Sequence, residues 1–245
     1  MDYTNKRILF MGDSITALGT GERGWVGYFN EVFKPSFFRV DAVSGARLAK
    51  EKDVELDGNP VFLGDKTDYT QNVMLNQIER VSRARKNANP DYDDFDLIII
   101  AAGTNDAYFE ENCNPETIEE QFTKDGKVVP SSEVNRCTWA GAMRIIYERL
   151  KEFYPNAKIC FCSPIQAEGT IRPYKYTLHK RNLMKAICER ISDVTFVDTL
   201  NCGICGIYEK PWDKGRDLID GLHPNVNGAK KIAEYNIRAI KQSLE

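Results

Sequence analysis

One of the two histidines in this chain of 245 residues lies in a short segment that could supply a general base. The segment reads Asp220-Gly221-Leu222-His223-Pro224. In a turn, a carboxylate three residues before an imidazole can fold back onto one ring nitrogen and leave the other nitrogen as an oriented base. A base of this kind needs a hydroxyl or thiol to act on. The alternative is a turn in which Asp220 and His223 only cap the last helix.

A serine that could be the nucleophile follows the first apolar segment. Gly12-Asp13-Ser14 comes directly after a strand predicted over residues 7–11. A serine at such a corner is presented at the edge of a sheet, and the adjacent glycine permits a tight turn. The alternative is an ordinary turn in which the hydroxyl caps a backbone N–H group, because Gly, Asp and Ser all favour turns.

Two further segments carry groups that could stabilise a developing negative charge. Gly103-Thr104-Asn105-Asp106 follows the most apolar run of the chain, and the amide of Asn105 could donate to an oxyanion. Ser44-Gly45 ends another predicted strand, where glycine offers an unobstructed backbone N–H group. Taken singly, each segment is equally explained as a turn or loop, since Asn and Asp form local hydrogen bonds to the backbone.

The elements that must position these groups alternate between strands and helices. Strands are predicted over residues 7–11, 38–43, 97–102, 158–163 and 194–198. The alternation predicts an α/β fold, a three-layer α/β/α sandwich with a central five-stranded parallel sheet, and we expect residues 1–245 to form a single domain. Apolar residues recur at helical spacing in four sets: Trp25, Phe29, Val32 and Phe33; Trp139, Met143, Ile146, Leu150 and Phe153; Leu183, Ile187 and Ile191; and Ala229, Ile232, Ala233, Ile237 and Ile240.

The four polar segments are expected to meet at one edge of this sheet. Ser14, Gly45 and Asn105 each follow a predicted strand, and His223 precedes the last helix. In open parallel sheets, ligands bind beyond the carboxyl ends of the strands. Together the segments provide a nucleophile, a base, a carboxylate that orients the base, and oxyanion donors. This combination is what acyl transfer requires.

The same segments resemble the sequence blocks of the SGNH hydrolases, also called the GDSL esterase/lipase family. The resemblance extends from Ile8 to about Ile240. Two departures occur: Ile15 replaces the leucine of the family name, and Asp41 stands nearest to the place where the second block often has an asparagine. The matching segments, in the order of the first, second, third and fifth blocks, are residues 12–16, Gly45, residues 103–106 and residues 220–224.

The resemblance implies a role for each matching residue. Ser14 would be the nucleophile, His223 the base and Asp220 the carboxylate that holds the imidazole. The backbone N–H groups of Ser14 and Gly45 and the side chain of Asn105 would form the oxyanion hole. The implied reaction is hydrolysis of a carboxylic ester through an acyl-enzyme, with no metal and no organic cofactor. The short spacing from Asp220 to His223 favours the SGNH type over α/β-hydrolases, in which the acid and the base usually come from separate loops.

Two long stretches, residues 46–72 and 107–135, follow strand ends, where long loops usually carry function. They are equally explained as surface excursions with no role in catalysis. An apolar groove there would favour long acyl chains, whereas a shallow polar site would favour acetylated sugars. The predicted substrate is therefore a small acyl ester, with O-acetyl groups on carbohydrate first, because the second stretch is polar. The residues concerned are Glu110, Glu111, Asn112, Asn114 and Glu116.

Two other functions remain open at this stage. A lipase, lysophospholipase or thioesterase on longer acyl chains is the alternative enzyme. A catalytically inactive module that binds an acylated or glycan ligand on the same fold is the alternative of another class.

The composition limits which binding partners and which cellular compartment are expected. A net charge of −3 and a pI near 5.6 give no reason to expect a nucleic-acid partner. No apolar stretch approaches the roughly 20 residues that a membrane span needs. The seven cysteines read as reduced thiols and no signal peptide is visible, so a cytoplasmic protein is expected. A chain trimmed of its signal would look the same, and the oligomeric state does not follow from the sequence.

Several other residues are assigned structural roles. Cys202-Gly203-Ile204-Cys205 is interpreted as a loop with structural thiols, the alternatives being half a zinc site or a redox pair. Cys160 and Cys162 are expected to pack within the layers. His179 is predicted as a surface residue rather than a second base.

Trp212 is predicted to pack in the core or a loop, with an aromatic wall over the site as the alternative. Arg47 and Lys50 are expected on a solvated loop face or against an anionic substrate.

Overall fold

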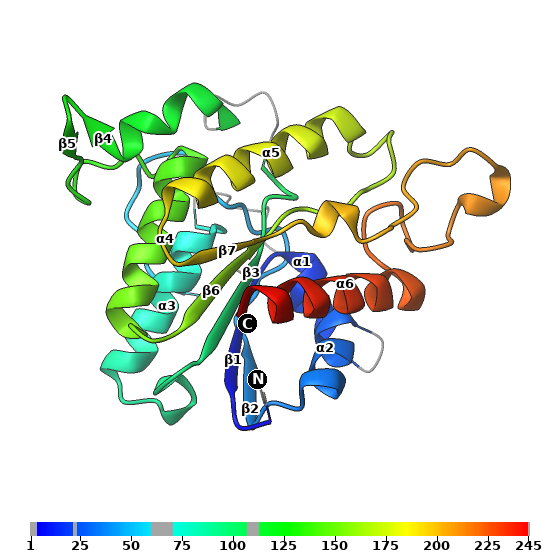
Figure 1. Cartoon of the computed structure of the whole chain (residues 1–245), viewed down its shortest axis with the longest axis horizontal. Helices are drawn as coiled ribbons and strands as arrows, with labels where there is room; N and C mark the ends of the chain where they lie inside the picture. The colour runs from blue at the N-terminus through cyan, green and yellow to red at the C-terminus, as the bar shows by residue number, and fades with distance from the viewer. Residues whose placement is uncertain (1–3, 22–23, 60–70, 107–112, 245) are drawn as a thin grey trace.

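Five parallel strands form a sheet at the centre of the computed structural model, which describes residues 4–21, 24–59, 71–106 and 113–244 (Figure 1). The strands lie in the order β2-β1-β3-β6-β7. All five predicted strands are confirmed, with differences of up to three residues at their ends. Their bounds are β1 Arg7–Gly12, β2 Phe37–Val40, β3 Leu97–Ala101, β6 Lys158–Cys162 and β7 Val194–Val197.

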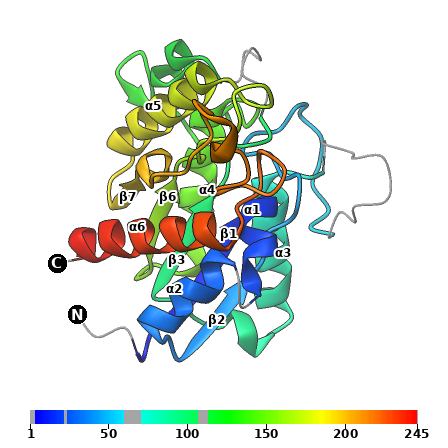
Figure 2. The same ribbon diagram turned by 90° about the vertical axis from the view of Figure 1, so that its right-hand side faces the viewer.

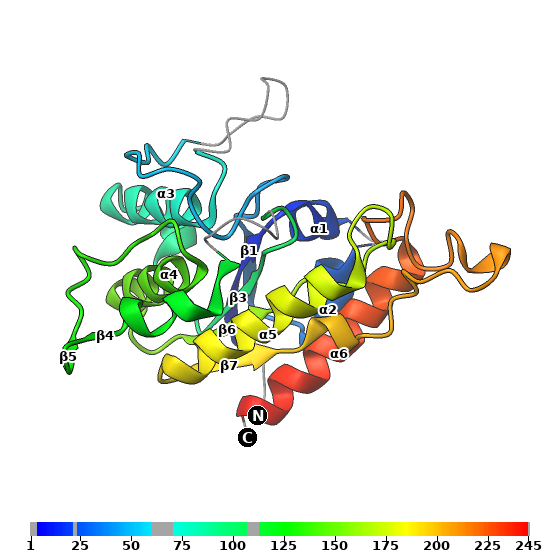
Figure 3. The ribbon, with the colours of Figure 1, turned by 90° about the horizontal axis from the view of Figure 1, so that it is seen from above.

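Helices cover both faces of the sheet (Figure 2 and Figure 3). Successive residues of a strand point to opposite faces, so each strand contributes to two apolar clusters. In β3, Ile98 and Ile100 belong to one cluster and Leu97 and Ile99 to the other. The predicted three-layer sandwich is therefore confirmed. One layer consists of α2 (Trp25–Phe33) and α6 (Val226–Leu244), and the other of α3 (Met74–Lys86), α4 (Trp139–Phe153) and α5 (Tyr174–Arg190).

Helix α3 does not follow from the sequence pattern. Its buried face includes Met74, Leu75, Ile78 and Val81 at helical spacing, but Asn76, Gln77 and Ser82 are buried among them although they are polar. The polar residues on the inner face weaken the apolar pattern without removing it. The reason for their burial is tertiary, because Gln77 bonds to the end of β1 and Asn76 bonds to Gly58.

The predicted burial of one residue on the apolar face of α2 is wrong. Trp25, Phe29 and Phe33, spaced four residues apart, are buried, but Val32 is 55% exposed. Val32 lies at the border of this apolar stripe, so helical spacing alone does not decide its burial.

The second long stretch contains short elements where the structure describes it. Asp125 and Gly126 both have positive φ angles, of 52° and 72°, as a tight hairpin turn requires. Residues 107–112 lie outside the described part, and with them Glu110, Glu111 and Asn112. The elements are the 3₁₀ turns Pro115–Thr117 and Glu119–Gln121 and the hairpin of β4 (Thr123–Lys124) with β5 (Lys127–Val128).

The strand order places a topological switch point beside β1. From β1 the chain crosses to β2 at one edge of the sheet, and it returns to β3 on the other side of β1. Ligands bind at such points, beyond the carboxyl ends of the strands. β1 ends at Gly12, next to Asp13 and Ser14, and β3 ends just before Gly103. The sheet thus brings two of the polar segments to one place.

Within the described residues, no helix is both long enough and apolar enough to span a membrane. That residues 1–245 form a single domain stays a prediction.

Candidate active site

Ser14 stands at the corner where β1 passes into the short helix α1 (Ser14–Ala17). Only glycine fits at position 12, because φ is 155° and a Cβ atom would lie 2.2 Å from the carbonyl oxygen of Ala101. Asp13 then caps the helix, with its Oδ1 accepting a hydrogen bond of 3.0 Å from the N–H group of Ile15. Backbone sterics and this cap fix Ser14 as the first residue of the helix.

A single short loop before α6 supplies the imidazole and its carboxylate. One oxygen of Asp220 accepts from the N–H groups of Leu222 and His223, at 3.0 and 2.8 Å. The other oxygen lies 2.8 Å from His223 Nδ1. Gly221, with a φ of 82°, lets the loop pass close to Glu168, whose Oε2 would lie 2.5 Å from an added Cβ atom. The carboxylate therefore folds back onto the imidazole as its spacing predicts.

The structure joins the serine corner and this loop. His223 Nε2 lies 2.9 Å from Ser14 Oγ, although the two residues are 209 positions apart. A neutral imidazole with its proton on Nδ1 donates to Asp220 and accepts the Ser14 hydroxyl proton at Nε2. The three side chains form a continuous hydrogen-bonded chain that is able to deprotonate the serine.

Asp220 keeps its charge in this arrangement. Partial burial raises its pKa, but hydrogen bonds from the backbone and ring of His223 and from the N–H group of Leu222 outweigh that effect and lower the pKa of Asp220 to about 2. The carboxylate is therefore ionised at neutral pH, and it favours the imidazolium that forms when His223 takes a proton.

The predicted oxyanion donors follow the carboxyl ends of β1, β2 and β3. Among the described residues, the backbone N–H groups of Ser14 and Gly45 have no hydrogen-bond acceptor. Asn105 Nδ2 donates to the carbonyl oxygen of Ala46 at 3.0 Å, which links the second and third polar segments. An amide nitrogen carries two hydrogens, so Asn105 retains one for a ligand.

Asp41, the departure from the family pattern, has a structural role. It is buried, and Tyr92 Oη lies 2.9 Å from both carboxylate oxygens as a donor. Arg39 Nε lies 3.4 Å from Oδ1. The N–H group of Asp41 continues the pairing with β1 by donating to Phe10 at 2.8 Å. Asp41 therefore holds the segment that leads to Gly45.

Two buried amides near the start of α3 support the site, and the sequence analysis missed both. Gln77 donates to the carbonyl oxygen of Gly12 at 2.8 Å and accepts from its N–H group at 3.2 Å. Asn72 donates to the carbonyl oxygen of Ser44 at 2.9 Å. A single Asn or Gln in a polar stretch gives no signal in sequence, because only burial makes such a side chain a fixed donor.

Asp106 joins three separate segments beneath the site. Its carboxylate accepts from the N–H groups of Leu48 and Ala49, at 2.8 and 3.2 Å, and from Trp139 Nε1 at 3.0 Å. All three donors are buried, so each needs this acceptor. Asp106 therefore fixes the loop of Asn105 against the loop of Gly45.

Lys180 of α5 holds the same loop from the other side, and no sequence motif pointed to it. It is 3% exposed, and its ammonium group donates to the carbonyl oxygens of Gly103 (2.9 Å), Thr104 (3.4 Å) and Asp106. Burial lowers the pKa of Lys180, and Asp106 opposes that effect. One side chain thus binds three carbonyl groups around Asn105.

Several expectations outside the site need correction. Lys50 is neither solvated nor directed at a ligand: it is 3% exposed and donates to Val54 and Asp53, at 2.6 and 3.1 Å. Trp212 is not packed in a core or loop, since it is 71% exposed. His179 is half-buried, with Nε2 2.8 Å from the carbonyl oxygen of Cys113, rather than a surface residue.

Arg47 Nη1 lies 3.6 Å from Glu51, so its charge has a partner within the chain.

The described cysteines are all free thiols. Cys160 and Cys162 pack toward α2 and α6, as expected. Cys202 is buried and Cys205 half-buried in the loop after β7. No group of three or more His, Cys, Asp or Glu side chains that could hold a metal occurs in the described part of the chain.

A comparison with protein families decides the family. The model of the GDSL-like Lipase/Acylhydrolase family matches residues 10–231. The chain belongs to this family. The resemblance read from the sequence blocks is therefore confirmed, and the protein is an ester hydrolase of the serine type. A search of curated proteins found no match.

Solved structures of this GDSL-like fold cover nearly the whole chain at low identity. A protein from Chitinophaga pinensis described as a possible lipase is 16% identical, with a TM-score of 0.58 over 98% of this chain and 99% of the other. A catalytic mutant of an acetylxylan esterase from Geobacillus stearothermophilus is 18% identical, with a TM-score of 0.53 over 98% and 96%. At such identities the likeness shows the fold alone.

A third structure comes from Corynascus thermopiles (Myceliophthora fergusii). It is a carbohydrate esterase family 2 enzyme with a carbohydrate-binding domain, and it is 18% identical with a TM-score of 0.56. The match covers 98% of this chain and 66% of the other.

Asp13, next to the serine, provides a pH-dependent prediction. It is 1% exposed, and burial raises the pKa of its carboxyl to about 6 although hydrogen bonds from Thr104 and Ile15 oppose this. The folded state therefore holds the proton at pH values where the unfolded state has released it. Stability is highest when Asp13 is protonated and falls as the pH rises from about 4 to 6.

We expect Asp13→Asn to remove this dependence while keeping the oxygen that caps α1. Relative to the variant, the wild type should lose about 2 kcal/mol of unfolding free energy between pH 4 and pH 7. Urea unfolding of both proteins across this range measures the difference. If the unfolding free energies of the two proteins changed in parallel with pH, Asp13 would not titrate between pH 4 and pH 7.

Lys180→Met is expected to loosen the loop of Asn105. The variant keeps the apolar stem but leaves the carbonyl groups of Gly103, Thr104 and Asp106 without their buried donor, which should cost about 2 kcal/mol or more. We also expect kcat for ester hydrolysis to fall more than in Lys185→Met, a change of a half-exposed lysine on the same helix. Thermal unfolding and steady-state kinetics of the two variants test this, and equal effects would contradict it.

Proposed function

We propose that the protein hydrolyses small acyl esters through a Ser14-His223-Asp220 triad and an acyl-enzyme. The contact that carries the proposal is the one between His223 Nε2 and Ser14 Oγ, at 2.9 Å, with Asp220 at 2.8 Å on the other ring nitrogen. A serine hydroxyl is a weak nucleophile on its own, and an oriented base is what activates it.

The proposed reaction has two halves. In the first, Ser14 Oγ attacks the ester carbonyl while its proton passes to His223 Nε2. The negative charge on the carbonyl oxygen is stabilised by the N–H groups of Ser14 and Gly45 and by Asn105. The bond from the carbonyl carbon to the alcohol oxygen then breaks, and His223 gives its proton to the departing alcohol.

In the second half, water replaces the alcohol. His223 takes a proton from the water as it attacks the acyl-enzyme, and the proton returns to Ser14 Oγ as the acid is released. Asp220 stabilises the imidazolium in both halves. The free N–H groups of Ser14 and Gly45 support this scheme, because they need no rearrangement before they bind an oxyanion.

The proposed acyl group is small, and O-acetyl groups on carbohydrate are the first substrates to test. Two of the similar structures are named as a carbohydrate esterase and an acetylxylan esterase, which supports this choice. Asn114 and Glu116, in the described part of the polar stretch, are not buried. The alternatives are longer acyl chains, as in a lipase or thioesterase, and a ligand-binding module without activity.

We expect Ser14→Ala to abolish hydrolysis of p-nitrophenyl acetate with little change in the thermal unfolding temperature. The side chain loses only one oxygen at a site that is 7% exposed. A fluorophosphonate probe should label the wild type and not the variant. Turnover by Ser14→Ala at the wild-type rate would exclude Ser14 as the nucleophile, and an unlabelled, inactive wild type would favour a binding module.

Asn105→Ala is expected to reduce kcat by roughly 10²–10³ with a smaller change in KM, because an oxyanion donor acts mainly on the transition state. Asn135→Ala serves as the control, since this asparagine of the 113–135 region bonds locally to Cys137. A loss that appears in KM alone would argue against an oxyanion role for Asn105.

A further inference from the structure

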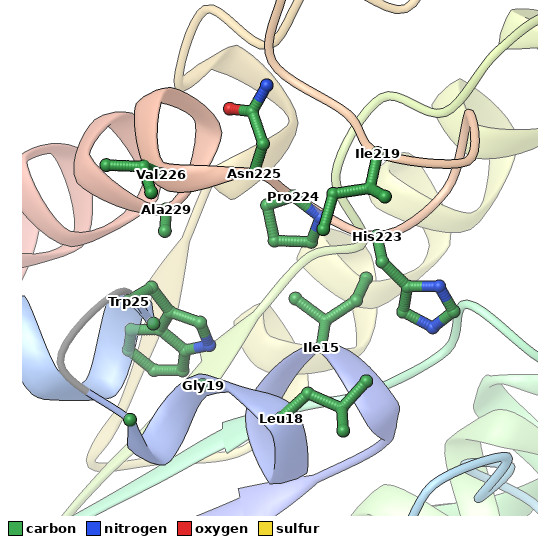
Figure 4. Close-up of a pocket in the computed structure, with 12 residues that line it drawn as sticks. Ile15, Leu18, Gly19, Trp25, Ile219, His223, Pro224, Asn225, Val226 and Ala229 are labelled. Atoms are coloured by element: carbon green, nitrogen blue, oxygen red, sulfur yellow. The ribbon is translucent and has the colours of Figure 1, made fainter. Parts of the chain in front are cut away.

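A pocket of about 320 Å³ opens beside His223, on the side of α2 and α6 (Figure 4). Its walls come from α1, from the N-terminal end of α2 and from the segment between Ile219 and the start of α6. His223 itself lines the pocket, so a molecule bound in it touches the proposed catalytic base. The proposed oxyanion donors Ser14, Gly45 and Asn105 are not among the described residues that line it.

The described lining of this His223 pocket is mostly apolar. Among the described residues that line it, His223 and Asn225 carry the polar side chains, and none is acidic or a Lys or Arg. Residues 22–23, between the lining Gly21 and Gly24, lie outside the described part. Two large apolar side chains are exposed at this place, Leu18 at 65% and Ile219 at 74%. Both line the pocket, and Figure 4 shows Ile219 above Ile15 and Leu18 below it. Covering them with an apolar ligand would remove both from water.

The chemistry of acyl transfer decides which part of an ester reaches this pocket. In the tetrahedral intermediate the carbonyl oxygen lies in the oxyanion hole, and the alcohol oxygen must lie near the imidazole that protonates it. The alcohol part is thus the part that lies at His223, whereas the acyl part stays bonded to Ser14. Since the pocket touches His223 and not the oxyanion donors, it faces the alcohol.

We propose that the pocket is a leaving-group site that selects esters of apolar alcohols, such as alkyl or aryl-alkyl alcohols. This inference rests on the proposed hydrolysis of small acyl esters. It predicts that acetates of apolar alcohols are better substrates than the acetylated carbohydrates named first under the proposed function. A small acyl group is cleaved from an alcohol whose apolar part lies between Leu18, Ile219 and Trp25. An unsubstituted sugar ring fits this apolar wall poorly, because its hydroxyl groups would find no hydrogen-bond partners there.

The test compares two series of esters that vary one part at a time. Acetates of straight-chain alcohols from methanol to hexanol vary the leaving group at similar acidity, and methyl esters from acetate to hexanoate vary the acyl chain. In the wild type, kcat/KM should rise about threefold for each methylene added to the alcohol. A flat alcohol series, or xylose tetraacetate cleaved faster than hexyl acetate, would overturn the proposal.

Gly21→Leu is the variant that fills the pocket. Gly21 lines it, has a φ of −75°, and a Cβ atom there would meet nothing within 4 Å, so the change introduces no backbone strain. We expect the hexyl-to-methyl ratio of kcat/KM to fall at least tenfold while the hexanoate-to-acetate ratio stays constant. The reverse pattern would show that the pocket binds the acyl chain and would overturn the assignment.

Leu18→Ser tests the edge of the pocket against a matched control. We expect a lower hexyl-to-methyl ratio in Leu18→Ser and an unchanged ratio in Val32→Ser, which removes an exposed apolar side chain of α2 that does not line the pocket. Equal ratios in the two variants would overturn the proposal.

A binding measurement separates this inference from the proposed function. Hexan-1-ol, the free leaving group, should bind Ser14→Ala in ligand-observed NMR and should not bind the Ser14→Ala/Gly21→Leu double variant. Binding with that difference supports the pocket even if Ser14 proved not to be the nucleophile. Equal binding by the two proteins would overturn the pocket while leaving the triad intact.

Discussion

The parallel pairing of β1 with both β2 and β3 is the constraint on which the site depends. β3 pairs with β1 from Ile8 to Gly12, so these two strands end level, and β2 pairs with β1 from Arg7 to Phe10 and ends two residues earlier. The N–H group of Asp13 then bonds to the end of β3, and that of Val43 bonds to Gly12. Because β1 lies at the switch point, the serine corner has a loop from a different strand on each side. The imidazole reaches the same place from the start of α6.

Buried polar side chains turn these neighbouring loops into one rigid unit. Gln77 holds the end of β1, Asp106 ties two loops to α4, and Lys180 binds the carbonyl groups around Asn105. Buried donors and acceptors without partners are costly, so each of these contacts strongly favours one loop geometry. The Ser14 hydroxyl and the His223 imidazole lie on short elements, but helices on both faces of the sheet keep them in position.

The fold could be predicted from the sequence because its signals are local. A strand buried on both faces, such as Leu97–Ala101, shows a continuous apolar run, and four of the five long helices show apolar residues at regular spacing. The prediction failed where burial depends on partners far away in the chain. Helix α3 was missed, and its inner face includes the polar residues Asn76 and Gln77. The predictions for Lys50 and Trp212 were wrong as well, because Lys50 is buried against Val54 and Trp212 is exposed.

The residues of the proposed site also differ in whether local sequence or distant contacts determine them. Short-range spacing indicated Asp220 and His223, since a carboxylate and an imidazole three residues apart can meet within one turn. Ser14 followed from its place after a predicted strand, from its combination with the other polar segments and from the family resemblance. Tertiary structure decided what lies around them. The Lys180 contacts and the apolar pocket beside His223 join residues that are far apart in sequence. No local pattern encodes such contacts, because they form only when the helices pack against the sheet and water is excluded between them.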